Sequence, residues 1–160
     1  LYADSILIMT TCDNENNKNK PKTTVLEPIK SLYQKGMRGL TIDFIGIDTY
    51  GGGTESSGEP KITKDLKREV KGKSVVLIDD ILDTGYSISV LKALILARQP
   101  RELKTAVLLS KQARRKVPVT VEYVGCEIED KFVVGYGLDY GGKYRELPYI
   151  GEVIFEEKAK

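Results

Sequence analysis

Short apolar runs separated by polar segments predict a sheet whose strands alternate with helices. The clearest run is 74–78 (SVVLI), which has charged residues on both sides. A continuous apolar run of this length is typical of a central strand that is buried on both faces. Residues 103–109 give a second strand of the same kind, and 41–47 give a third that is rich in β-branched residues.

One segment between these strands has the apolar spacing of a helix, at Ile88, Leu91, Leu94 and Ile95. The stripe predicts a helix over 87–98, with Ser87 as its N-cap and Pro100 closing it. A helix between two apolar strands predicts a parallel sheet with right-handed crossovers. Further strands are predicted over 119–128 and 132–137. The fold class is therefore α/β.

The first 39 residues are less regular. Residues 6–9 form a short apolar run that suits a strand, and the polar tract 12–20 that follows suits a loop or linker. Apolar residues recur at helical spacing over 26–34. Because Leu1 is not an initiator methionine, we expect the chain to be incomplete or processed at its start.

The composition of the chain excludes several classes of function. The chain has 160 residues, the size of one domain, and a net charge of +2, which is too balanced for a protein that mainly binds nucleic acid. It has no histidine, which excludes histidine-based triads, and its two cysteines lack metal-ligand spacing. No apolar run approaches the length of a membrane helix, so we expect no membrane partner and a cytoplasmic location.

The most informative stretch is 75–87, where a buried strand leads through two acids into a helix. Asp79 and Asp80 follow the apolar run, and Asp83-Thr84-Gly85-Tyr86-Ser87 forms a turn before the helix. Free backbone N–H groups at a helix N-terminus suit a phosphate, and Gly85 allows close backbone approach. The acids suit sugar hydroxyls or a magnesium ion. The alternative is an ordinary helix start, with acids placed near the positive end of the helix dipole.

Residues 76–87 resemble the phosphoribosyl-pyrophosphate signature of the type I phosphoribosyltransferases. The segments 122–140 and 144–151 resemble the hypoxanthine–guanine branch of that family, and 49–58 its mobile active-site loop. The resemblance covers about 40–153. It implies one domain over 1–160, with an atypical segment over 1–39. It also implies a mostly parallel sheet flanked by helices, with a small hood and a mobile loop.

The resemblance implies transfer of a phosphoribosyl group from phosphoribosyl pyrophosphate to hypoxanthine or guanine, with Mg²⁺. Asp79 and Asp80 would meet the ribose hydroxyls and the metal shell. Asp83 would be the general base near the purine N7. Residues 84–87 would cradle the 5′-phosphate: Thr84, Gly85, Tyr86 and Ser87. Members of the family commonly form homodimers or homotetramers.

The resemblance also implies purine and pyrophosphate contacts. Lys111 would donate to the purine 6-oxo group, although within the basic run 111–116 it could equally be a solvated lysine. Phe132 would stack on the base and Val133 would read its edge, although an isolated phenylalanine is more often a core residue. Asp139 would be a magnesium-linked acid on the purine side, and Arg145 a pyrophosphate contact. Without the motif, both are ordinary surface charges.

Two segments of the expected site have more than one interpretation from the sequence. Thr49 and Tyr50 begin a glycine-rich stretch that suits either a lid excluding water or a simple hairpin tip. A pyrophosphate loop is expected near Lys22, with 35–36 as the weaker alternative. Residues 6–9 are either the strand preceding that loop or unrelated sequence.

Three functions are compatible with this pattern. The first is an active purine salvage enzyme. The second is a regulator that binds phosphoribosyl pyrophosphate or a nucleotide without chemistry, although such a protein would be expected to lack Asp83 or the purine-reading tail. The third is a truncated enzyme that folds but does not turn over, which the atypical first 39 residues suggest.

Overall fold

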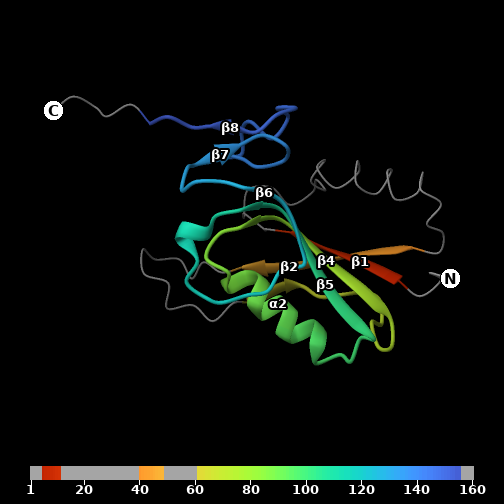
Figure 1. Cartoon of the computed structure of the whole chain (residues 1–160). Coiled ribbons are helices and arrows are strands. Elements are labelled where there is room, and N and C mark those ends of the chain that lie inside the picture. The colour runs from red at the N-terminus through yellow and green to blue at the C-terminus, as the bar shows by residue number, and fades with distance from the viewer. Residues whose placement is uncertain (1–4, 12–39, 49–60, 156–160) are drawn as a thin grey trace.

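The computed structural model describes residues 5–11, 40–48 and 61–155. A six-stranded sheet forms its centre, in the order β3-β2-β1-β4-β5-β6 (Figure 1). The parallel strands are β1 (Ser5–Thr11), β2 (Thr41–Asp48), β4 (Ser74–Leu82), β5 (Glu102–Ser110) and β6 (Tyr123–Glu127). One edge strand, β3 (Lys61–Lys64), runs antiparallel to β2. The prediction of a mostly parallel α/β sheet is confirmed.

The short apolar run at 6–9 is a strand in the middle of the sheet. β1 pairs with β2 on one side, where Ile8 lies opposite Asp43, and with β4 on the other, where Ile8 lies opposite Leu77. The predicted helix over 26–34, Lys22, Thr49 and Tyr50 lie outside the described residues.

Helix α2 (Tyr86–Leu96) follows β4 and packs its apolar stripe on the sheet. Ile88, Leu91 and Ile95 are buried in a core with Val75 and Leu77 of β4. Leu94, the fourth residue of the predicted stripe, is partly buried against the same core. The hydrophobic spacing therefore identified the buried face of this helix correctly.

Three predicted boundaries were wrong. β4 does not stop at Ile78 but continues through both acids to Leu82, because β5 remains paired with it as far as Ser110. The N-cap of α2 is Gly85 rather than Ser87, and no side chain caps the helix. The strand predicted over 119–128 is shorter, because only 123–127 form β6.

The segment after β6 forms a separate two-stranded sheet rather than one strand over 132–137. β7 (Val133–Val134) pairs antiparallel with β8 (Gly151–Glu152). We call residues 133–152 the hood; it lies at the top of Figure 1, above the carboxyl ends of β4 and β5. Turns between its strands hold the backbone, with Tyr136 N donating to Leu147 O and Gly137 N to Arg145 O.

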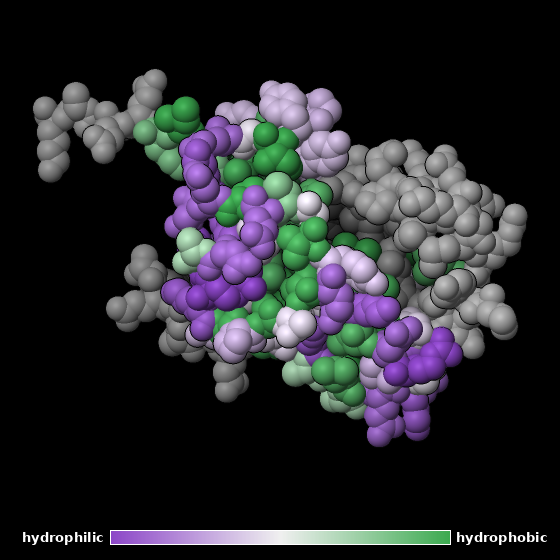
Figure 2. Space-filling model, viewed as in Figure 1, coloured by the Kyte–Doolittle hydropathy of each residue, from purple (hydrophilic) through white to green (hydrophobic). Residues whose placement is uncertain are grey.

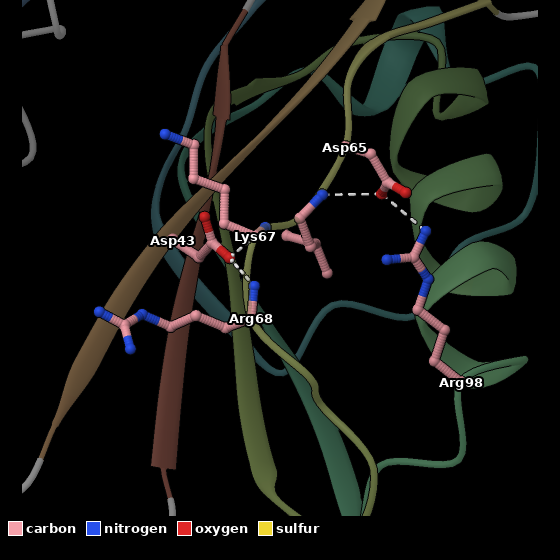
Figure 3. A network of polar contacts seen from close by, with 6 residues as sticks. Asp43, Asp65, Lys67, Arg68 and Arg98 are labelled. Atoms are coloured by element: carbon pink, nitrogen blue, oxygen red, sulfur yellow. Dashed lines mark hydrogen bonds and ion pairs between the residues drawn. The ribbon is translucent and has the colours of Figure 1, made fainter.

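A buried carboxylate joins β2 to the segment before β4 (Figure 3). Asp43 is 5% exposed, and its Oδ2 accepts hydrogen bonds of 2.8 Å from the backbone N–H groups of Lys67 and Arg68. Its Oδ1 accepts from Phe44 N at 2.8 Å. Because a buried carboxylate needs such donors, Asp43 fixes the approach of the chain to β4.

One edge of the sheet remains uncovered among the described residues. Every residue of β6 is exposed, including Tyr123 and Val124, and β6 pairs with β5 alone. In Figure 2 apolar residues run through the middle of the face shown, with polar residues on both sides. Within the described ranges, no helix is long and apolar enough to cross a membrane.

Candidate active site

The two acids of the motif lie at the carboxyl end of β4, in the centre of the sheet, where ligands collect in parallel α/β folds. Asp79 is 8% exposed, and its Oδ1 accepts from Asp80 N at 3.0 Å. Asp80 is half-buried. Neighbouring residues of a strand point to opposite faces, so the two carboxylates diverge and Asp80 is the more accessible one.

The turn between β4 and α2 is built to expose backbone N–H groups; we call residues 83–87 the phosphate turn. Gly85 has φ 90°, a left-handed conformation that glycine adopts without strain. No side chain caps α2, and its first turn contains no acidic residue. The first N–H groups of the helix are therefore available to an anion, and the helix dipole favours one there.

A second segment packs directly on the phosphate turn; we call residues 111–117 the bracing segment. The N–H groups of Lys116 and Val117 donate to Thr84 O at 2.9 and 3.1 Å, and Lys111 N donates to Leu82 O at 2.9 Å. A Cβ atom added to Gly85 would lie 2.7 Å from Val117 O. Only glycine fits at this position, because both its conformation and the space around it exclude a side chain.

Side chains of the bracing segment also hold the turn. Arg115 Nε donates to Asp83 O at 3.2 Å, and its Nη2 donates to Ser110 Oγ at 3.1 Å. Arg114 Nε lies 2.9 Å from Asp83 Oδ1. Both arginines belong to the basic run 111–116, in which only Lys111 was predicted to have a role. The signal that could have found them is their place directly after a buried strand, next to the phosphate motif.

Asp83, the predicted general base, presents a buried oxygen. Its side chain is 36% exposed, but Oδ1 is buried and has no hydrogen-bond donor, since Arg114 approaches it outside hydrogen-bonding geometry. A buried carboxylate oxygen with unused acceptor capacity is costly unless a ligand completes it. The arrangement suits a group that accepts a proton from a substrate.

Lys111 is buried rather than solvated. It follows the last residue of β5, is 6% exposed, and precedes the short 3₁₀ helix η2 (Gln112–Arg114). Its ammonium has no hydrogen-bond or ion-pair partner within the described part of the chain. A lysine this buried is rare unless paired, which distinguishes Lys111 from an ordinary surface lysine.

Two of the predicted purine residues lie where the chain enters the hood, with Phe132 just before it and Val133 as its first residue. Phe132 is 44% exposed and therefore not a core residue; it makes edge-to-face contacts with Tyr140 and Phe155, with ring centroids 5.4 and 5.9 Å apart. Val133 is half-buried in β7. An exposed ring held by two others is preorganised for stacking.

Lys131 forms ion pairs next to the first strand of the hood. Its pKa is raised by a hydrogen bond with Glu152, by the charge of Glu152 and by similar contacts with Glu129. The ammonium lies 3.0 Å from Glu152 and 3.4 Å from Glu129. Because Lys131 directly precedes Phe132, its ion pair with Glu152 ties this part of the chain to β8.

Asp139 and Arg145, predicted to contact metal and pyrophosphate separately, are bonded to each other. Arg145 Nη2 lies 2.7 Å from Asp139 Oδ1, and Arg145 Nη1 donates to Gly137 O at 2.6 Å. Asp139 Oδ2 also accepts from Gly142 N at 2.7 Å. The buried Nε of Arg145 has no acceptor, so one donor remains available to a ligand.

Among the described residues, no three side chains of the metal-ligating kind gather at one point. Magnesium in proteins is often held by one or two carboxylates together with substrate phosphates and water, and Asp80 is the more accessible of the two acids of β4.

The chain is similar to known proteins over most of its length. Residues 25–141 match the family model of the phosphoribosyl transferase domain. The hypoxanthine phosphoribosyltransferase of Haemophilus influenzae is 46% identical over 118 residues, which are 74% of this chain and 66% of that protein. The Escherichia coli hypoxanthine phosphoribosyltransferase is 44% identical over 113 residues, 71% of this chain and 64% of that protein. The chain thus spans slightly less than two thirds of these two relatives.

A solved structure agrees with these matches. The crystal structure of a hypoxanthine phosphoribosyltransferase from Staphylococcus aureus superposes with a TM-score of 0.78 and 37% identity. The superposition covers 94% of this chain and 76% of that one.

Proposed function

The chain belongs to the phosphoribosyltransferase family, and from this premise we propose that it is a purine salvage enzyme. It transfers the 5-phosphoribosyl group of phosphoribosyl pyrophosphate to hypoxanthine or guanine and forms IMP or GMP. The bond from the ribose C1 to pyrophosphate breaks, a bond to a purine nitrogen forms, and the purine loses a ring proton. One observation carries the proposal: the buried Oδ1 of Asp83 accepts no hydrogen bond and lies next to the uncapped start of α2.

Each part of the site has a task in this reaction. The N–H groups at the start of α2, with Thr84 and Ser87, hold the 5′-phosphate, and Tyr86 contributes through its backbone. Asp79 and Asp80 accept from the ribose hydroxyls, Asp80 being the more accessible of the two. Asp83 receives the purine proton and stabilises the positive charge that develops on the sugar.

The purine lies against the hood. Phe132 stacks on the ring, and Val133 presents its backbone to the ring edge. The Lys111 ammonium donates to a 6-oxo group, which selects hypoxanthine or guanine over adenine, because the 6-amino group of adenine is itself a donor. The unpaired ammonium of Lys111 supports this role.

Pyrophosphate and its metal complete the proposal. Bound Mg²⁺ would neutralise charge on the departing pyrophosphate, and Asp79, Asp80 and Asp139 are the protein acids that would share the ion. Arg145 would contact pyrophosphate through its unused Nε. Lys22, with Thr49 and Tyr50 of the expected lid, would close the site from segments outside the described residues. A cytoplasmic homo-oligomer is the expected form of the protein, as the resemblance implies.

The test is a spectrophotometric assay with phosphoribosyl pyrophosphate, Mg²⁺ and each of hypoxanthine, guanine, xanthine and adenine. We expect nucleotide from 6-oxopurines and not from adenine. Asp83→Asn should lower kcat by about 10²- to 10⁴-fold while the protein stays folded. Omission of Mg²⁺ should abolish turnover. Binding of phosphoribosyl pyrophosphate without turnover of any base would refute the enzyme and leave a binding protein.

A further inference from the structure

Arg114 lies between two acids that come from opposite sides of the candidate site. Its Nε is 2.9 Å from Asp83 Oδ1 in the phosphate turn, and its Nη1 is 3.6 Å from Asp130 Oδ1, two residues before Phe132. The arginine thus connects the proposed base to the segment that presents the purine-stacking ring. Among the described residues, no other ion pair joins these two segments.

The position of Arg114 is set by its backbone rather than by its own contacts. It is the last residue of η2, and Arg115 N donates to Gln112 O at 3.1 Å to close that turn. Before it, Lys111 N donates to Leu82 O at the end of β4; after it, the chain bonds to Asp83 O and Thr84 O of the phosphate turn. Because the main chain is held on both sides, the guanidinium projects from a fixed base.

We propose that Arg114 is a positioning residue that holds the Asp83 carboxylate and the segment 130–133 in one fixed relation. This role rests on the proposed function, in which the purine lies between those two groups. A proton moves efficiently to Asp83 only when the carboxylate and the ring nitrogen are within hydrogen-bonding distance, and small misplacement is costly.

The geometry of the contact supports a role for Arg114 in positioning Asp83 rather than in occupying its acceptor oxygen. Arg114 attracts Asp83 Oδ1 without a hydrogen bond to it, so the acceptor capacity of that oxygen remains for the substrate. A guanidinium presents five donors in a planar fork and can face two carboxylates together. A lysine in its place offers one compact charge, which can approach one acid or the other.

The experiment compares Arg114→Gln, Arg114→Lys and Asp130→Asn in steady-state assays with hypoxanthine and phosphoribosyl pyrophosphate. The matched control is Arg98→Gln, because Arg98 pairs with Asp65 at 2.6 Å on the surface, away from the phosphate turn. Thermal unfolding of every variant separates a general loss of stability from a loss of position.

We expect Arg114→Gln to lower kcat about 10- to 100-fold, with KM for phosphoribosyl pyrophosphate within about twofold of the parent. The phosphate turn keeps its backbone bonds and Arg115, which is why that KM stays. Arg114→Lys should recover part of kcat. Asp130→Asn should cause a smaller fall, and it should add nothing to Arg114→Gln, since both act through one contact.

Two results would overturn the inference. One is an unchanged kcat in Arg114→Gln; the other is an equal fall in kcat and melting temperature in Arg114→Gln and Arg98→Gln. If the parent makes no nucleotide, calorimetry with IMP separates the two proposals. A parent that binds IMP, with affinity lost in Arg114→Gln and kept in Arg98→Gln, would retain the Arg114 role while the catalytic function fails. A parent that binds no IMP would end both.

Discussion

Arg145 and Asp139 form a 2.7 Å ion pair across the turns of the hood, and the same arginine donates to Gly137 O. Their side chains are 26% and 18% exposed, so the pair is largely shielded from water. The sequence motif suggested two separate ligand contacts. The structure makes the pair a support of the hood and leaves the buried Nε of Arg145 without an acceptor.

Arg145→Met should therefore destabilise the chain as well as weaken pyrophosphate contact. It leaves Asp139 without its cation and Gly137 O without its donor, which costs on the order of 1–3 kcal/mol of unfolding free energy. Denaturant unfolding measures this. Asp139→Asn is the milder control, because an amide oxygen can still accept from Gly142 N. A raised KM for phosphoribosyl pyrophosphate with unchanged stability would show that Arg145 acts on the ligand alone.

The sequence predicted the sheet and the buried face of α2 because both depend on apolar periodicity, which is local. It did not predict where β4 ends, because a strand continues as long as its neighbour supplies hydrogen bonds. β5 pairs with β4 up to Ser110, so Asp79 and Asp80 lie inside the strand although acids usually mark its end.

The helix start and the bracing contacts depended on residues far along the chain. Ser87 is a good cap by type, but the chain turns two residues earlier, at Gly85, because Val117 O leaves no room there for a side chain and the left-handed conformation favours glycine. Likewise, nothing local marks Arg114 as a partner of Asp83, 31 positions before it. The motif predicts which residues belong to the site, whereas contacts with distant residues decide how those side chains are arranged.

Gly85→Ala should cost both stability and phosphate affinity. The added Cβ would meet Val117 O at 2.7 Å while φ stays at 90°, so the bracing segment must move. The control is Gly72→Ala, which has a φ of 70° but nothing within 4 Å of the new Cβ. We expect Gly72→Ala to lose about 1 kcal/mol from backbone strain alone and Gly85→Ala clearly more.

Kinetics complete the comparison between the two glycines. Only Gly85→Ala should raise KM for phosphoribosyl pyrophosphate, because Gly72 lies before β4 and away from the phosphate turn. Equal losses of stability with equal KM values in the two variants would contradict the packing argument.

Lys111→Met should separate stability from function. Lys111 is 6% exposed and its ammonium has no partner among the described residues, so removing the charge should leave the unfolding free energy unchanged or raise it. The loss of the donor to the 6-oxo group should raise KM for hypoxanthine by roughly tenfold or more. Lys104→Met, on exposed β5 surface, is the control and should change neither quantity. A strong loss of stability in Lys111→Met would assign the lysine to structure.

The ion pair of Asp65 with Arg98 should stabilise the chain in a pH-dependent way (Figure 3). Partial burial opposes ionisation, but hydrogen bonds from Arg98 and Leu66 N, with the charge of Arg98, lower the pKa of Asp65 below its ordinary 3.8. A carboxyl whose pKa is lower in the folded chain adds stability above its unfolded pKa and loses it as pH falls through the folded value. Asp65→Asn should therefore cost about 0.2–1 kcal/mol at neutral pH, a small amount because the pair is exposed. That difference should fade below about pH 3.8. The control is Glu69→Gln, because the carboxylate of Glu69 has no ion pair in the described segments. This variant should unfold like the parent at every pH. A loss of the same size at pH 7 and pH 3 would assign the effect to the hydrogen-bond geometry, which an amide disturbs at any pH.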